Sequence, residues 1–102
     1  MNVNEYGVPF VFSTGYDMSA DTAIRINFTK PDGTVLSVAD PLVTVPTIDL
    51  QTTDGLFLAH QYVSYTFQNG DVDQVGIWSA RVYYTDLTRG LISDAAEFEV
   101  FP

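Results

Sequence analysis

A period of two in the hydrophobic pattern constrains this chain more than any other feature of its sequence. Large apolar side chains alternate with polar ones through residues 23–29, 76–85 and 96–101. Such alternation is typical of a β-strand with one buried and one exposed face. The pattern predicts a shared core face that includes Ile24, Ile26, Phe28, Trp78, Phe98 and Val100.

The segments between these runs carry turn signals and no helical pattern. Lys30 is followed by Pro31, Asp32 and Gly33, which favour a tight turn because proline presets φ, aspartate bonds locally and glycine accepts positive φ. Residues 34–39 then follow as the return strand, and residues 87–90 form a second turn. Further strands are expected at 7–13, 47–51, 56–59 and 63–67. No window shows the 3.6-residue period of a helix.

We therefore expect an all-β chain, folded as a β-sandwich or small barrel of about seven strands. Its length of 102 residues fits one domain over residues 1–102, with residues 1–6 as an N-terminal arm.

Charge and cysteine content exclude several functional classes. Thirteen acidic residues against four basic ones give a net charge of −9, which argues against nucleic acid and anionic membranes as partners. The absence of cysteine removes disulfides and thiolate chemistry. The N-terminal residues lack the pattern of a signal peptide, so synthesis and folding in a cytoplasm are expected.

No motif predicts an enzyme, a metal site or a cofactor. His60 is the single histidine, and no local signature of a nucleophile supports Ser64 or Asp54 beside it, so a polar residue on a strand or its edge is the simpler interpretation. Asp71 and Asp73 lie in an oxygen-rich segment, but the helices and the later ligands of a calcium loop are missing. We interpret that segment as a polar turn.

Aromatic residues offer one alternative. The tyrosines and the tryptophan could form a platform for stacking sugars: Tyr6, Tyr16, Tyr62, Tyr65, Tyr83, Tyr84 and Trp78. Aromatic residues on strands more often pack in the core or across strands, so core packing is the favoured interpretation.

Three segments, in order, carry a family resemblance: residues 16–35 with "Asp-x-Ser-x-Ala" and "Lys-Pro-Asp-Gly-Thr", residues 70–78 with "Gly-Asp-Val-Asp-x-x-Gly-x-Trp", and the final "Phe-x-Val" at residues 98–100. Together they resemble small virion proteins of tailed bacteriophages that have an immunoglobulin-like β-sandwich. The resemblance covers residues 16–101, with a looser match over residues 36–66. It implies that the motif residues Pro31, Asp32, Gly33, Asp73, Gly76 and Trp78 are structural.

The second segment also resembles the Asp-x-Gly-x-Tyr-x-Cys stretch of immunoglobulin domains in a variant form. Trp78 stands at the position of the corner tyrosine, and Ala80 replaces the cysteine. These departures exclude the disulfide between the sheets. We expect Trp78 to supply core volume and its indole N–H to reach a backbone carbonyl.

The resemblance implies a non-enzymatic virion protein, a capsid decoration subunit or another head or tail accessory, whose partners are phage capsid or tail proteins and copies of itself. The candidate assembly residues form the arm: Met1, Asn2, Val3, Asn4, Glu5 and Tyr6. The apolar segment from Val3 to Phe12 could add to a neighbour's sheet edge, although the first strand of its own sandwich is the simpler interpretation. Two alternatives stay open: a carbohydrate- or receptor-binding module of a baseplate or fibre, and a detached domain of a larger cell-surface protein.

Overall fold

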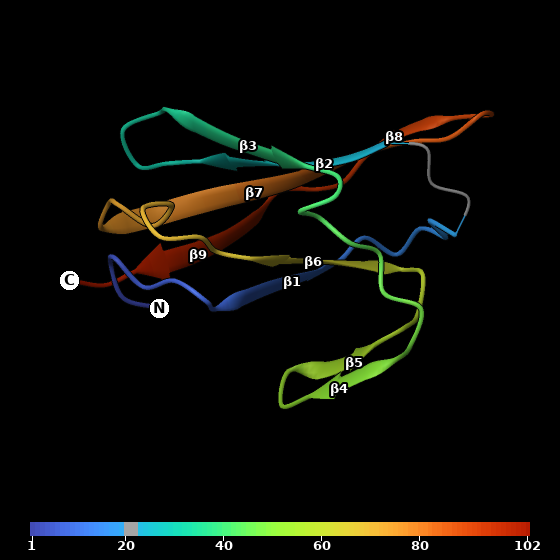
Figure 1. Ribbon diagram of the computed structural model, residues 1–102, viewed down its shortest axis with the longest axis horizontal. Coiled ribbons are helices and arrows are strands. Elements are labelled where there is room, and N and C mark those ends of the chain that lie inside the picture. The colour runs from blue at the N-terminus through green and yellow to red at the C-terminus, as the bar shows by residue number, and fades with distance from the viewer. Residues whose placement is uncertain (20–22) are drawn as a thin grey trace.

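The computed structural model describes residues 1–19 and 23–102, and these residues form nine strands and no helix (Figure 1). The strands are β1 (Pro9–Ser13), β2 (Ala23–Thr29), β3 (Val35–Ala39), β4 (Leu50–Thr52), β5 (Gly55–Phe57), β6 (Tyr62–Thr66), β7 (Gly76–Thr85), β8 (Gly90–Ile92) and β9 (Ala96–Val100). Ala20, which ends the Asp-x-Ser-x-Ala motif, lies outside the described residues. Since the described residues form no helix, they include no helical membrane span.

One sheet is built around the long strand β7. It has the order β3-β2-β7-β8, and β9 also pairs with β7, all antiparallel. Strands β8 and β9 lie along one edge of β7 and are separated around Ser93. The Ser93 hydroxyl accepts a hydrogen bond from the Val82 amide at 2.8 Å and donates one to the Asp94 carbonyl at 2.9 Å. This buried serine therefore keeps the backbone bonded where the ladder is interrupted.

A second, smaller sheet consists of β1 and β6, which pair antiparallel. On the other side of β6, Thr44 and Ser64 exchange backbone hydrogen bonds at 3.0 Å each. At the N-terminus, Asn2 forms a parallel bridge with Phe101, which follows β9 directly. Figure 1 shows the two sheets as layers, with both chain ends at the same end of the molecule.

The hydrophobic core fills the space between these layers. Its buried members come from both sheets and include Ile24, Ile26, Phe28, Val63, Tyr65, Trp78, Ala80, Val82, Tyr84 and Val100. The alternation predicted for residues 23–29 and 76–85 is therefore confirmed, because the expected inward residues of β2 and β7 are all buried. Phe98 is half-buried and packs against this core.

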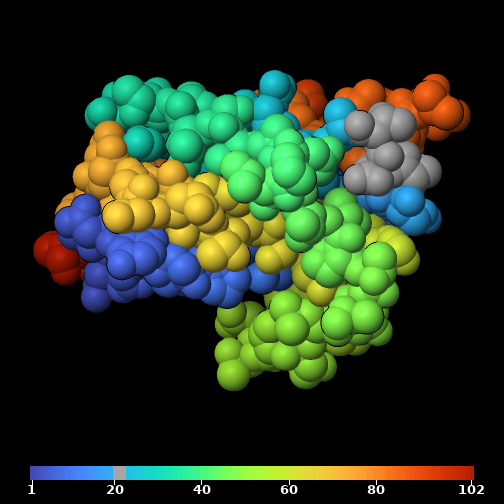
Figure 2. Space-filling view, in the orientation of Figure 1, coloured from blue at the N-terminus to red at the C-terminus, as the bar shows by residue number. Residues whose placement is uncertain are grey.

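The number and ends of the strands differ from the expectation in the middle of the chain. Strands were expected at residues 47–51 and 56–59, but β4 and β5 are three-residue strands on either side of a tight turn. In that turn the Thr52 hydroxyl accepts a hydrogen bond from the Asp54 amide and donates one to the Gly55 carbonyl, each at 3.1 Å. Because of these local bonds, the paired residues lie next to the turn. The hairpin projects from the body of the molecule (Figure 2).

Candidate functional site

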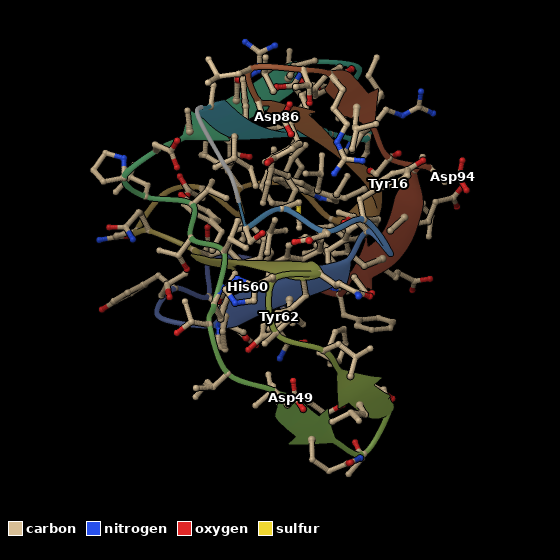
Figure 3. The ribbon with its side chains drawn as sticks, turned by 90° about the vertical axis from the view of Figure 1, so that its right-hand side faces the viewer. Tyr16, Asp49, His60, Tyr62, Asp86 and Asp94 are labelled. Atoms are coloured by element: carbon tan, nitrogen blue, oxygen red, sulfur yellow. The ribbon has the colours of Figure 1, made fainter. Side chains whose placement is uncertain are left out.

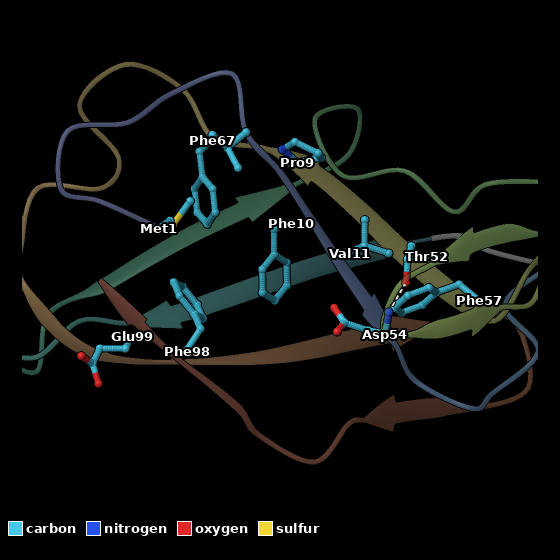
Figure 4. A pocket seen from close by; sticks show the side chains of 11 residues that line it. Met1, Pro9, Phe10, Val11, Thr52, Asp54, Phe57, Phe67, Phe98 and Glu99 are labelled. Atoms are coloured by element: carbon cyan, nitrogen blue, oxygen red, sulfur yellow. Dashed lines mark hydrogen bonds between the residues drawn. The ribbon is translucent and has the colours of Figure 1, made fainter. Parts of the chain in front are cut away.

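A groove runs along one side of the molecule, between β1 and β9. We call it the β1–β9 groove, and its volume is about 520 Å³. Met1 lies at one end and the β4–β5 hairpin at the other, and the full lining is Met1, Val8, Pro9, Phe10, Val11, Thr52, Asp54, Phe57, Phe67, Phe98 and Glu99 (Figure 4). Its size is in the range of sites that hold a small molecule or several side chains.

Three phenylalanines form the floor of the groove. The ring of Phe10 lies 5.6 Å from that of Phe98 and 6.1 Å from that of Phe67. Phe10 also meets the buried ring of Phe28 edge-on at 5.1 Å. Because these rings contact one another within the geometry of favourable aromatic pairs, the floor is an apolar continuation of the core.

Carboxylates lie on the rim of this apolar groove. Asp54 lies in the turn of the β4–β5 hairpin and Glu99 on β9, and both line the groove. Among the described residues, neither carboxylate forms an ion pair. The groove thus joins an aromatic floor to a negatively charged rim.

The arm residues Met1–Tyr6 lie along their own chain. The Val3 amide donates to the Phe101 carbonyl and the Asn4 amide to the Val72 carbonyl, both at 2.7 Å, and the Phe101 amide donates to the Met1 carbonyl at 2.9 Å. Met1 and Val3 pack against the core, Glu5 accepts a hydrogen bond from the Asn2 amide, and Tyr6 is 63% exposed. The segment is docked on its own sheet edge, and only part of its surface is available to a partner.

The structure brings two of the matching sequence segments together. The Lys30 ammonium lies 2.9 Å from a carboxylate oxygen of Asp73 and 5.6 Å from the centre of the Trp78 ring. The Gln74 side chain accepts a hydrogen bond from the Asp32 amide at 3.2 Å. These contacts hold the turn at residues 30–33 against the link before β7, the segment of residues 70–75 that contains Asp73 and Gln74. This fits a structural role for these motif residues.

Gly76 is needed where this link meets the turn. Its φ is +130°, and a Cβ atom at this position would lie 3.0 Å from Cγ of Pro31. We expect Gly76→Ala to lower the free energy of unfolding by about 1–3 kcal/mol, because it adds both backbone strain and a clash. Urea denaturation measures this. Gly90→Ala is the control, since its Cβ would meet nothing within 4 Å; equal losses in the two variants would contradict the prediction.

The two aspartates considered for a cation site bond to the protein itself. Asp71 accepts a hydrogen bond from the Tyr65 hydroxyl at 2.5 Å and one from the Gln68 amide at 2.8 Å, while Asp73 pairs with Lys30. Burial, and then the bond to Asp71, raise the pKa of Tyr65. Within the described part of the chain, no group of three or more acids and histidines is arranged to hold a metal ion. Asp71 thus closes the polar turn between β6 and β7.

His60 was interpreted as a polar residue on a strand or its edge, and it lies in the turn just before β6. It precedes β6 with a φ of 63°, and its amide donates to the Pro46 carbonyl at 2.9 Å. Figure 3 places His60 beside Tyr62 near the base of the hairpin, with Asp86 at the opposite side of the molecule. The backbone of His60 holds two loops together, since its carbonyl also accepts a hydrogen bond from the Met18 amide.

Asp86 organises the turn between β7 and β8. Its carboxylate accepts hydrogen bonds from the Thr88 and Arg89 amides at 2.8 Å each and from the Thr88 hydroxyl at 2.9 Å. These bonds, that of the Thr88 amide first, lower the pKa of Asp86 to about 2. Arg89 also donates to the Asp17 carbonyl at 2.7 Å, so this turn is tied to the loop that follows β1.

This turn should make stability depend on pH in the acid range. A carboxyl group whose pKa is lower in the folded state stabilises the protein above its unfolded pKa of about 4, and this stabilisation is lost as the pH falls toward 2. We expect Asp86→Asn to be less stable than the wild type at pH 7 and the difference to shrink between about pH 4 and pH 2. Thermal unfolding at several pH values checks this. Asp94→Asn is the control, since that carboxylate accepts no hydrogen bond from the described residues; a pH-independent effect of Asp86→Asn would be the contrary result.

The aromatic side chains do not form one exposed platform. Trp78 is fully buried, Tyr62, Tyr65 and Tyr84 are at most 3% exposed, and Tyr83 is half-buried with Arg25 above its ring at 5.3 Å. The exposed tyrosines are Tyr6 and Tyr16, which lie before β1 and after it. The favoured interpretation of the strand aromatics as packing residues therefore holds for these buried rings.

Comparison of the chain with protein-family models, with curated proteins and with solved structures gives no match.

The groove was not among the features expected from the sequence. The apolar run at residues 8–12 predicts a strand, and the alternation at residues 96–101 predicts another, but neither pattern indicates that their edges lie side by side. Phe67 was expected only as the end of a strand. The signal closest to the groove is the aromatic content of these segments, with Phe10 and Phe98 as its central pair.

Proposed function

We propose that this chain is a non-enzymatic structural subunit of a tailed-bacteriophage particle, a capsid decoration protein or another head or tail accessory, that acts through protein–protein contacts. The observation that carries the proposal is the β1–β9 groove, an apolar surface beside two sheet edges. It includes Met1, a candidate assembly residue, and residues 8–11 of the apolar N-terminal segment. Concave sites lined mainly by hydrophobic and aromatic side chains with a few polar groups are typical of binding sites.

The strand pairing supports an immunoglobulin-like β-sandwich as the fold of this subunit. With β2, β7 and β9 taken as strands C, F and G, β3 takes the place of C′, and β1, β6 and the Thr44 segment take the places of B, E and D. This assignment follows the B-E-D and G-F-C-C′ strand orders of a variable-type domain. The β4–β5 hairpin is then an insertion between D and E.

The distribution of aromatic residues supports assembly over sugar binding. A sugar platform needs adjacent exposed rings, whereas the two exposed tyrosines lie before and after β1, and Trp78 is buried. The net charge of −9 is compatible with a position on the outside of a particle and unfavourable next to packaged DNA.

The test is whether the chain is part of particles. Particles from the source that encodes the chain are purified by density gradient, and the chain is quantified by mass spectrometry relative to the major capsid protein. We expect a constant ratio across the particle peak. A chain that remains entirely in the soluble fractions, with a soluble host enzyme as the reference, would overturn the proposal.

A further inference from the structure

We propose that the β1–β9 groove binds an extended segment of a different protein, in which basic and apolar residues alternate, and that this segment adds as a strand to the free edge of β9. The inference deepens the proposed function, on which it rests, by naming the surface and the chemistry of its partner. Four observations carry it: the free backbone groups of β9, the apolar floor, the acidic rim and the placement of the chain's own cations.

The first observation is that the outer edge of β9 is open. In an antiparallel ladder, successive residues point their N–H and C=O groups alternately toward and away from the partner strand. Phe101 points both groups away from β7, since they bond to Val3 and Met1. Glu99 and Glu97, two and four residues earlier, therefore point theirs the same way. In residues 1–19 and 23–102, β7 pairs with the other side of β9, and no strand pairs with these outward groups.

The chain itself shows that this edge accepts a strand. Residues 1–3 add to it at Phe101 in parallel orientation, and Met1 lines one end of the cavity. The opposite edge, on β1, is a poorer template, since Pro9 has no N–H to donate. An incoming segment therefore pairs with β9, next to the arm.

The second observation concerns the side chains of the incoming segment. Alternate residues of an added strand point to opposite faces. One set would enter the groove and cover Phe10, Phe67 and Phe98, and the cavity volume of about 520 Å³ accommodates several aliphatic side chains. These positions of the partner are apolar.

The third observation gives the charge of the other set. Glu97 and Glu99 are exposed and flank the inward-facing Phe98, and Asp54 adds a carboxylate at the far end of the groove. Residues of an added strand that face outward would lie beside these acids, where opposite charges stabilise and like charges repel. The outward positions of the partner are therefore lysine or arginine.

The fourth observation excludes a second copy of this chain. The chain has four cations: Arg25 and Arg81 lie within β2 and β7, Lys30 pairs with Asp73, and Arg89 pairs with Asp86. No free segment can supply a basic strand, and two β9 edges meeting would oppose glutamates. The acids thus protect the edge from self-association and leave it open to a basic partner.

The probe is a blocked peptide of alternating lysine and valine, roughly seven residues long, which spans the five residues of β9. Binding is measured by calorimetry and mapped by backbone amide NMR shifts at low ionic strength. We expect the shifts to centre on residues 97–99 and the lining phenylalanines. A peptide with the same composition but lysines and valines in separate blocks should bind at least about tenfold more weakly.

Two variants and a matched control test the edge. Glu99→Lys should weaken binding about tenfold, whereas Asp94→Lys, the same charge change five residues away and outside the lining, should change it less than about twofold. Glu97→Pro removes an outward N–H that β7 does not use, and should abolish binding while the fold, checked by circular dichroism, is retained.

The inference would be overturned if the two peptides bound equally well, or if the two lysine variants had equal effects on binding. NMR shifts spread over all acidic surfaces would also contradict it, and so would a dimer formed through residues 97–99 in sedimentation experiments. These outcomes are separable from failure of the proposed function. If the chain binds the peptide but is absent from particles, the groove assignment holds and the phage role is wrong. If the chain is present in particles but does not bind the peptide, only the groove assignment is wrong.

Discussion

Trp78→Ala is expected to lower the free energy of unfolding by about 3–5 kcal/mol, the typical cost of removing a buried large aromatic side chain. The Trp78 side chain has no exposed surface, and its ring centre lies 5.9 Å from that of Phe98. Its indole N–H donates to the Gln74 carbonyl at 3.0 Å, which confirms the bond to a backbone carbonyl expected from the sequence. The substitution removes this bond and leaves a cavity between the sheets. Urea denaturation followed by circular dichroism measures the loss.

A conservative variant separates volume from hydrogen bonding. Trp78→Phe retains most of the ring volume and loses only the N–H, so it should cost less than Trp78→Ala. A denaturation midpoint of Trp78→Ala close to that of the wild type would show that this residue is not a core element. Such a result would also revive the sugar-stacking alternative, which requires an exposed tryptophan.

Deletion of residues 1–6 should leave a folded domain that is less stable by about 2–4 kcal/mol. None of the fully buried residues lies in this segment, so the core remains. The loss arises because Met1 and Val3 no longer cover the core, and because the carbonyls of Phe101 and Val72 lose their donors. Thermal or urea unfolding measures the change.

Tyr6→Ala is the matched control for this deletion. Tyr6 is 63% exposed, and its substitution should change stability by less than about 0.5 kcal/mol. If the arm is an assembly element, the deletion also abolishes incorporation into particles at temperatures where the domain is folded. Normal occupancy of particles by the truncated chain would remove that role from residues 1–6, and unchanged stability would contradict their docking on Phe101.

Much of the fold can be predicted from the sequence because half-buried strands reveal themselves through alternation. Ile24, Ile26 and Phe28 are buried as their spacing predicts, and the turn at Lys30–Gly33 follows from its residue types. The hairpin of β4 and β5 is less predictable, since strands this short have too few residues for a periodic signal and their ends depend on bonds at Thr52.

The candidate site depends on relations that lie beyond local sequence. Phe10 and Phe98 are far apart in the chain and meet at 5.6 Å because β1 and β9 form neighbouring edges of different sheets. Likewise, the fastening of Lys30 to Asp73 requires the turn and the link to converge. The sequence motifs include these residues, but they come into contact only because the two sheets pack together.

The amino-acid sequence is enough to predict that this chain is all-β and which faces of its principal strands are buried, since hydrophobic periodicity acts on each strand separately. Which strand edges are paired and which are open depends on how the two sheets pack. Apart from proline, every residue carries the same backbone N–H and C=O groups, so the hydrophobic pattern does not indicate what these groups bond to. Packing of the two sheets brings the open edge of β9 beside an aromatic groove with an acidic rim, and this juxtaposition turns a small acidic domain into a candidate receptor for a basic strand.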